Sequence, residues 1–210
     1  LEKSIRELVT DPNGIYVDVT YGGGGHSKEV LLRLSKKGKL FAFDQDIDSK
    51  KNIIDDTRFF FINSNFKHLK KFLNHFDVDK VSGIIADFGV SSYQLDIPSR
   101  GFSIKKDGPL DMRMNKNSNL TAESVINDYE EKKLYKILKE YGEVNQASEI
   151  VSKIISYRKT KPIKSTIDLV KVIENSINKF SRYIFHFNSM LVKIIITLFI
   201  YYIEYNKNIF

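Results

Sequence analysis

The chain has 210 residues, 42% of them hydrophobic, which suits one globular core or one core with a small satellite domain. It contains no cysteine, which excludes disulfides, thiolate metal sites and thiol nucleophiles and favours a reducing compartment, the cytoplasm or an organelle matrix. The net charge of +7 favours a polyanionic partner such as nucleic acid, although lysine-rich surfaces also occur without one.

The first ninety residues alternate short apolar segments with helical patterns. Strands are predicted at 14–20, 39–43, 59–63 and 81–87. Crossover helices are predicted at 27–36, 47–56 and 66–76. This order of elements is typical of one half of a doubly wound parallel sheet.

Four consecutive glycines, 22–25, follow the first predicted strand and precede His26 at the start of a helix. Glycine lets the backbone approach a ligand closely, and the amino terminus of a helix favours carboxylate or phosphate. A flexible turn is the alternative, but four glycines lose backbone entropy without adding any packing. No Gly-Lys-Ser/Thr follows, so this is not a P-loop.

Acidic residues end the first two predicted strands. Asp44 lies about twenty residues after the glycines, from where a carboxylate can bind both hydroxyls of a ribose, in NAD and S-adenosylmethionine equally. Asp18 is expected to orient the glycine loop rather than to react. Phe66 begins the helix after the third strand, where its ring can pack against an adenine or, equally, in the core.

A polar stretch rich in glycine and proline, 87–114, follows the fourth predicted strand, which the sequence indicates is buried. Open α/β sheets bind ligands beyond the carboxyl ends of their strands, so we interpret this stretch as an active-site loop. Asp87-Phe88-Gly89 imitates the magnesium motif of kinases, but no other kinase motif is present. The four histidines are scattered, so no metal site is predicted.

After residue 114 the pattern changes to amphipathic helices without strand candidates. Helices are predicted at 130–141, 146–157 and from Ser165 onward. Residues 113–182 carry 14 basic and 9 acidic side chains, and so hold most of the net positive charge. This segment is expected to be a helical satellite domain.

Residues 18–27, 43–46 and above all 87–114 resemble the RsmH/MraW family of S-adenosylmethionine-dependent methyltransferases. The longest strings that carry the resemblance are Arg100-Gly101-Phe102-Ser103 and Gly108-Pro109-Leu110-Asp111-Met112-Arg113-Met114. The resemblance runs to about residue 180. It implies an α/β fold, a Rossmann-like class I methyltransferase parallel sheet that is incomplete here, with an inserted all-α domain.

The resemblance also implies a function and a division of the chain. The family methylates the exocyclic N4 of a cytidine in 16S rRNA of the small ribosomal subunit, near the decoding site. The predicted segments are a methyltransferase half-domain at 1–112, a helical RNA-recognition insertion at 113–182 and a divergent apolar tail at 183–210.

Carried over by position, the resemblance implies S-adenosylmethionine contacts from Gly24, Gly25, His26, Asp44, Phe66, Asp87 and Gln94. Asp87 is the expected catalytic residue, which orients the cytosine amine or accepts its proton. Contacts with RNA phosphates are expected from Arg100, Arg113, Arg158, Lys159, Lys161 and Lys164, with plain solvation as an equal alternative for each.

The chain departs from the family pattern at two places. Tyr93 stands where the family usually has proline, and the family's later strings are absent after His186. Without later strands the fourth strand would present an unpaired apolar edge, which predicts aggregation or a partner such as a second copy in a homodimer. A shifted reading frame or a truncated gene is our hypothesis for the tail.

A membrane span is the alternative for the apolar segment at 183–203, whose length is close to that needed to cross a bilayer. Lys193 near its middle disfavours that reading.

Two rival functions stay open. An NAD-dependent oxidoreductase fits the glycine loop and Asp44 but leaves 87–114 unexplained. An inactive fragment would keep the affinity for RNA and lose that for S-adenosylmethionine.

Overall fold

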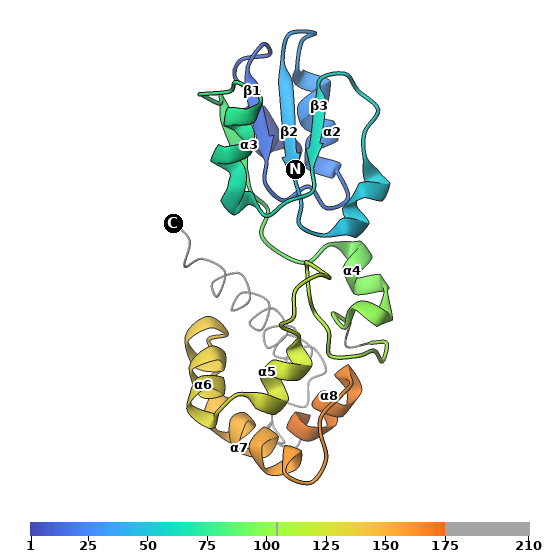
Figure 1. Cartoon of the computed structure of the whole chain (residues 1–210), viewed down its shortest axis with the longest axis vertical. Helices are drawn as coiled ribbons and strands as arrows, with labels where there is room; N and C mark the ends of the chain where they lie inside the picture. The colour runs from blue at the N-terminus through green and yellow to red at the C-terminus, as the bar shows by residue number, and fades with distance from the viewer. Residues whose placement is uncertain (104, 175–210) are drawn as a thin grey trace. The chain divides into compact units, whose positions relative to one another are not determined.

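Four short apolar segments form a parallel sheet in the computed structural model, which describes residues 1–103 and 105–174. The strands are β1 (Ile15–Asp18), β2 (Lys39–Phe43), β3 (Phe59–Ile62) and β4 (Gly83–Ile85). They lie in the order β3-β2-β1-β4 (Figure 1). Val17 of β1 is paired with Phe41 of β2 and Ile84 of β4. The predicted α/β fold class is confirmed, and each strand lies within its predicted bounds.

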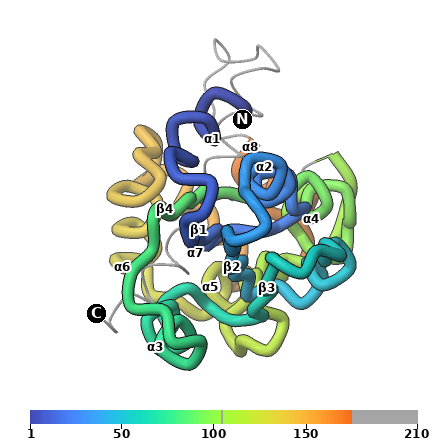
Figure 2. The backbone as a smooth tube through the Cα atoms, turned by 90° about the horizontal axis from the view of Figure 1, so that it is seen from above, coloured from blue at the N-terminus to red at the C-terminus, as the bar shows by residue number. Residues whose placement is uncertain are grey.

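Helices cover both faces of this sheet. They are α1 (Glu2–Leu8), α2 (Gly25–Arg33), η1 (Ile47–Asn52), η2 (Phe66–His68) and α3 (Leu69–His75). Successive strand residues point to opposite faces, so Tyr16 joins one core cluster with Val30 of α2. Val17 joins another with Leu73 of α3. Figure 2 accordingly shows α2 and α3 on opposite sides of β1 and β2.

The helix predicted at 47–56 is shorter and of another type than expected. The Asp46 side chain accepts the N–H of Asp48 at 3.1 Å and begins a 3-10 helix, η1. The N–H of Ile53 donates to the Lys50 carbonyl at 3.4 Å, which closes the last 3-10 turn. The β-branched pair Ile53 and Ile54 then favours extended backbone. The prediction of a longer α-helix here is therefore wrong.

The strand before Asp87 is more exposed than predicted. The Ile84 side chain is 48% exposed, and Gly83 and Ile85 are partly buried. In the part of the chain that the structure describes, β4 pairs with β1 alone. The prediction of a buried fourth strand is thus wrong for the described residues, because one of its two edges has no strand beside it there.

The remaining elements are helical. They are α4 (Ser92–Asp96), η3 (Pro98–Arg100), α5 (Ala122–Asp128), α6 (Glu131–Lys136), the π-helical turn η4 (Ile137–Tyr141), α7 (Ala147–Arg158) and α8 (Thr166–Glu174). The three predicted helices are confirmed, with the last turn of 130–141 widened into the π form. The stretch 87–114, predicted as a loop throughout, contains α4 and η3, which is a correction. Leu134, Ile150 and Ile154 are completely buried in this helical part.

The chain divides into two compact units. Among the described residues, the first comprises Leu1–Gly89 and Met114–Lys116, and the second comprises 90–103, 105–113 and 117–174. The predicted segment 1–112 therefore contributes to both units, and the bounds 1–112 and 113–182 stay predictions. None of the helices within 1–103 and 105–174 has the length and apolar character that crossing a bilayer requires. The tail predicted at 183–210 lies outside the described residues.

Candidate functional site

The carboxyl ends of β1, β2 and β4 gather the predicted site residues of the first unit. Asp18 is the last residue of β1, Asp44 follows β2 directly, and Asp87 lies two residues beyond β4. Parallel strands end at the same edge of a sheet, so residues distant in sequence lie near one another there. Residues 19–24, called the glycine loop below, connect β1 to α2 at this edge and contain the first three of the four glycines.

The glycine loop has two positions whose backbone conformation favours glycine. Gly22 and Gly24 have φ values of 51° and 77°, in the left-handed region. A Cβ atom on Gly24 would lie 2.8 Å from the Tyr21 hydroxyl. A Cβ atom on Gly23 or Gly25 would meet nothing within 4 Å. The loop therefore borders open space at the start of α2, where a ligand can approach the backbone.

Asp18 is buried, with 1% exposure, and its carboxylate joins two parts of the loop. One oxygen, Oδ1, accepts the backbone N–H of Thr20 at 3.0 Å. The other, Oδ2, accepts the Ser27 hydroxyl at 2.8 Å, in the first turn of α2. Burial raises the pKa of Asp18, and the hydrogen bond from Ser27 opposes that rise. Asp18 thus fixes both ends of the glycine loop.

Asp44 fixes the loop from the second strand. Its Oδ2 accepts the N–H of Gly22 at 2.7 Å, and its Oδ1 accepts the N–H of Asp46 at 2.8 Å. Burial raises the pKa of Asp44, while these two backbone hydrogen bonds lower it. The carboxylate is therefore oriented before any ligand binds, and its contact with a ribose stays a prediction.

Asp87 is the exposed acid of the site, with 71% of its side chain accessible. Its Oδ2 lies 4.0 Å from Nδ1 of His26, which follows the glycines. Its backbone N–H donates to the Thr20 hydroxyl at 2.7 Å. The structure thus places His26 near Asp87, while their contact with a cofactor stays a prediction, and it adds Thr20, which was not among the predicted site residues. Thr20 lies between Asp18 and the glycines in the sequence, but its bond to Asp87 joins residues 67 positions apart, which no local pattern indicates.

Phe66 packs partly in the core and partly beside the site. It contacts the cluster that contains Val17 and Leu73. Its ring centroid also lies 5.8 Å from that of Phe88, whose side chain is 63% exposed. Core packing, one of the two roles considered for Phe66, is therefore present, and contact with an adenine stays a prediction.

Gln94 belongs to the second unit. Its side-chain oxygen accepts the N–H of Ser91 at 2.9 Å, and the Ser91 hydroxyl accepts the N–H of Gln94 at 3.2 Å. This reciprocal pair is a capping box that begins α4. Gln94 therefore has a structural role within its own unit, and its contact with a cofactor stays a prediction.

The two segments that carry the family resemblance, 100–103 and 108–114, contact each other within the second unit. Gly101 has a φ of 73°, and a Cβ atom there would lie 2.2 Å from the Pro109 carbonyl oxygen. The Met112 N–H donates to the Arg100 carbonyl at 3.0 Å. Arg100 itself is 4% exposed, and its guanidinium donates to the Arg113 carbonyl at 2.7 Å. These contacts give both strings a structural role.

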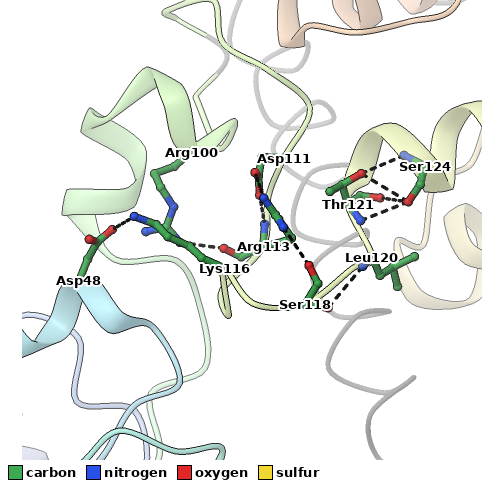
Figure 3. Close-up of polar contacts among 9 residues, drawn as sticks. All are labelled: Asp48, Arg100, Asp111, Arg113, Lys116, Ser118, Leu120, Thr121 and Ser124. Atoms are coloured by element: carbon green, nitrogen blue, oxygen red, sulfur yellow. Dashed lines mark hydrogen bonds and ion pairs between the residues drawn. The ribbon is translucent and has the colours of Figure 1, made fainter.

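Arg113 is held by a neighbouring acid (Figure 3). Its Nε and Nη2 donate to the two carboxylate oxygens of Asp111 at 2.9 and 2.7 Å, and its Nη1 donates to the Ser118 carbonyl at 2.8 Å. Burial by itself raises the pKa of Asp111, but the hydrogen bonds and the positive charge of Arg113 outweigh burial, so the pKa is lowered overall. The guanidinium is thus engaged on several sides.

The predicted phosphate contacts fall into two groups. The three arginines are engaged within the protein, since Arg158 also donates to the carbonyls of Ile126 and Tyr129, at 2.7 and 2.6 Å. The three lysines, Lys159, Lys161 and Lys164, are exposed. Contact with phosphate stays a prediction for all six, and burial does not support it for Arg100. Within the described ranges no three acidic or histidine side chains could hold a metal ion together.

A parallel sheet of order 3-2-1-4 with a glycine loop after its first strand and acids after its second and fourth strands is a Rossmann-like arrangement, which suits class I methyltransferases and NAD-dependent dehydrogenases alike. The family model described as the MraW methylase family matches residues 1–191. This chain belongs to that family. The match includes the first residues of the segment predicted as divergent from 183.

Curated relatives carry the name Ribosomal RNA small subunit methyltransferase H. That of Flavobacterium psychrophilum is 49% identical over 82% of this chain and 60% of its own length. That of Christiangramia forsetii is 50% identical over 80% of this chain and 56% of its own. That of Malacoplasma penetrans is 50% identical over 82% of this chain and 57% of its own length. The chain therefore spans about three fifths of the length of these relatives.

Proposed function

We propose that this chain supplies the cofactor site and part of the RNA-binding surface of an S-adenosylmethionine-dependent methyltransferase. Its substrate is the N4 amine of a cytidine in 16S rRNA. The observation that carries the proposal is the exposed Asp87 carboxylate beside His26 and the glycine loop. The family membership and the names of the relatives support it.

The residues at the carboxyl ends of the strands are suited to binding S-adenosylmethionine. The backbone at Gly25 borders open space at the amino terminus of α2, where the methionine carboxylate would be favoured. The oriented carboxylate of Asp44 would receive the ribose hydroxyls. Phe66 offers an aromatic edge for the adenine. When bound, the cofactor supplies an electrophilic methyl group on its sulfonium.

Asp87 would act on the nucleophile. The lone pair of the cytosine amine is delocalised into the ring, so the amine must be aligned with the methyl group and must lose a proton. A carboxylate next to the site can accept a hydrogen bond from the amine and then its proton. Because Asp87 is exposed, a base extruded from its stack could reach it.

The small ribosomal subunit is the partner we infer, in the cytoplasm or an organelle matrix. The exposed lysines at 159, 161 and 164 would contact phosphates without reading sequence. The cytidine would be selected by the pocket around Asp87 and by the surrounding RNA structure.

Calorimetric titration of S-adenosylmethionine into the 210-residue chain tests the cofactor site. We expect saturable binding that Asp44→Ala weakens by about tenfold or more, because the acid for the ribose and the anchor of Gly22 are both lost. Asp55→Ala removes an exposed acid outside the site and should change the affinity by less than about twofold. Binding of NADH alone would favour an oxidoreductase, and binding of RNA alone would favour an inactive fragment.

Methyl transfer to unmethylated small subunits tests the chemistry. Asp87→Asn keeps the size of the side chain and removes the base, so turnover should fall by roughly a hundredfold or more. The affinity for S-adenosylmethionine should fall far less than the turnover. Equal turnover in Asp87→Asn and the parent chain would contradict the role of Asp87.

A further inference from the structure

Thr20 connects two ends of the site that are 67 residues apart in the chain. Its hydroxyl oxygen accepts the backbone N–H of Asp87 at 2.7 Å. The same hydroxyl lies 3.4 Å from Oδ1 of Asp18, toward which it donates. Its own backbone N–H donates to that oxygen at 3.0 Å. The side chain thus stands between a buried acid and the expected catalytic acid.

The hydrogen bond between Thr20 and Asp87 extends the pairing of β1 with β4 beyond the last backbone hydrogen bond between these strands. Asp18 is paired with Ile85 across β1 and β4, and the Val19 N–H donates to the Ile85 carbonyl at 3.0 Å. Two residues further along, the N–H of Asp87 meets the hydroxyl of Thr20. A side chain therefore takes the place of the next backbone acceptor, just where the two strands separate around the site.

The Asp87 carboxylate has little else to fix it in the first unit. Its side chain is 71% exposed, and its Oδ2 lies 4.0 Å from Nδ1 of His26, which is too long for a directional hydrogen bond. The backbone anchor at 2.7 Å is shorter and lies next to a buried group. The position of the carboxylate is therefore set mainly through its backbone.

We propose that Thr20 is a positioning residue, whose hydroxyl transmits the fixed place of Asp18 to the backbone of Asp87. Asp18 also holds Ser27 in the first turn of α2. The glycine loop, which would hold the methyl donor, and Asp87, which would receive the amine, are thereby connected to one buried carboxylate, that of Asp18. The catalytic consequence rests on the proposed function, whereas the hydrogen bond itself does not.

Amide hydrogen exchange in the ¹⁵N-labelled full chain tests the hydrogen bond directly. Thr20→Val keeps the shape of the side chain and removes the hydroxyl, so the Asp87 amide should exchange about tenfold faster. Thr20→Ser is the matched control, since it restores the hydroxyl and should return exchange to within about twofold of the parent. Thr20→Ala repeats the test should the valine variant fail to fold. Equal protection of the Asp87 amide in the parent, Thr20→Val and Thr20→Ala chains would overturn the proposal.

Methyl transfer tests the consequence. A misplaced acid should lower the turnover of Thr20→Val by about tenfold to a hundredfold, with the S-adenosylmethionine affinity within about threefold and activity rescued in Thr20→Ser. A loss of affinity as large as the loss of turnover would assign Thr20 a merely structural role and overturn the proposal. If the parent chain transfers no methyl group, the proposed function fails, and the exchange measurement still decides the role of Thr20.

Discussion

The three carboxylates at the ends of the strands of this site, Asp18, Asp44 and Asp87, differ in their burial and in their hydrogen bonds. Asp18 and Asp44 are oriented by hydrogen bonds from the glycine loop and its surroundings. Asp87 is exposed and stands beside His26. Burial opposes ionisation of the first two and raises their pKa values. The two buried acids therefore shape the loop, and the exposed acid is the one available for chemistry.

The buried charge of Asp18 predicts a pH dependence of stability. Its pKa is raised in the folded state above an ordinary value of 3.8, mainly by burial. The folded chain thus binds this proton more tightly than the unfolded chain, and the stabilisation is lost as pH rises above about 3.8 through the raised pKa.

Asp18→Asn keeps the shape and removes the titration. We expect the unfolding free energy of the parent, minus that of Asp18→Asn, to fall as pH rises through this window. Urea titrations from acid to neutral pH measure the difference. A difference that stays constant or rises with pH would contradict the prediction.

At the scale of elements, side chains of one helix form hydrogen bonds with backbone groups at the end of another. The end of α5 is one example, because the Arg158 guanidinium from α7 donates to the carbonyls of Ile126 and Tyr129 there. A cation near the carboxyl end of a helix is favourable, and its hydrogen bonds occupy carbonyls that the helix leaves unpaired. Arg158 is thus part of the packing between α5 and α7.

Replacing Arg158 should therefore affect folding. Arg158→Lys loses the planar fork of donors, and we expect the unfolding free energy to fall by about 1–2 kcal/mol. Lys159→Ala, at the next position and exposed, should change it by less than about 0.5 kcal/mol. Chemical denaturation of the two variants measures both effects. A loss for Lys159→Ala that matched that of Arg158→Lys would contradict this assignment.

At the scale of the whole molecule, the chain leaves the first unit after Gly89 and returns to it briefly at Met114–Lys116. There the Lys116 ammonium pairs with Asp48 at 2.8 Å, and both residues belong to the first unit (Figure 3). The segment 90–113 is thus attached to the first unit at both of its ends. Most of the net positive charge, by contrast, comes from residues 113–182, where basic side chains outnumber acidic ones by 14 to 9.

The location of that charge predicts where RNA binds. Replacing Lys159, Lys161 and Lys164 together by glutamine should weaken binding to a 16S rRNA fragment and reduce its salt slope by about two, if all three contact phosphates. Replacing the exposed Lys36, Lys37 and Lys39 removes the same charge from the first unit and should have less effect. Filter binding at several salt concentrations compares the two triples. Equal losses would mean that only net charge matters.

Local patterns were sufficient to predict much of this chain. Short apolar runs predicted the four strands, and the glycines and acids at their ends predicted where the site lies, because parallel strands all end at one edge. The resemblance in 87–114 predicted the family. These features depend on residues that are close in sequence.

Other features were decided by tertiary structure. The bond from Thr20 to Asp87 joins residues far apart in the chain, so no local pattern could indicate it. Arg100 carries a charge that was expected to contact phosphate at the surface, yet it is 4% exposed and its guanidinium donates to the Arg113 carbonyl, thirteen residues further along the chain. The sequence by itself determined the strands and the edge of the sheet at which a ligand is expected to bind. Only the tertiary structure decided which polar groups at that edge are committed to the fold and which remain for chemistry, because hydrogen bonds between distant segments form only once the strands are paired.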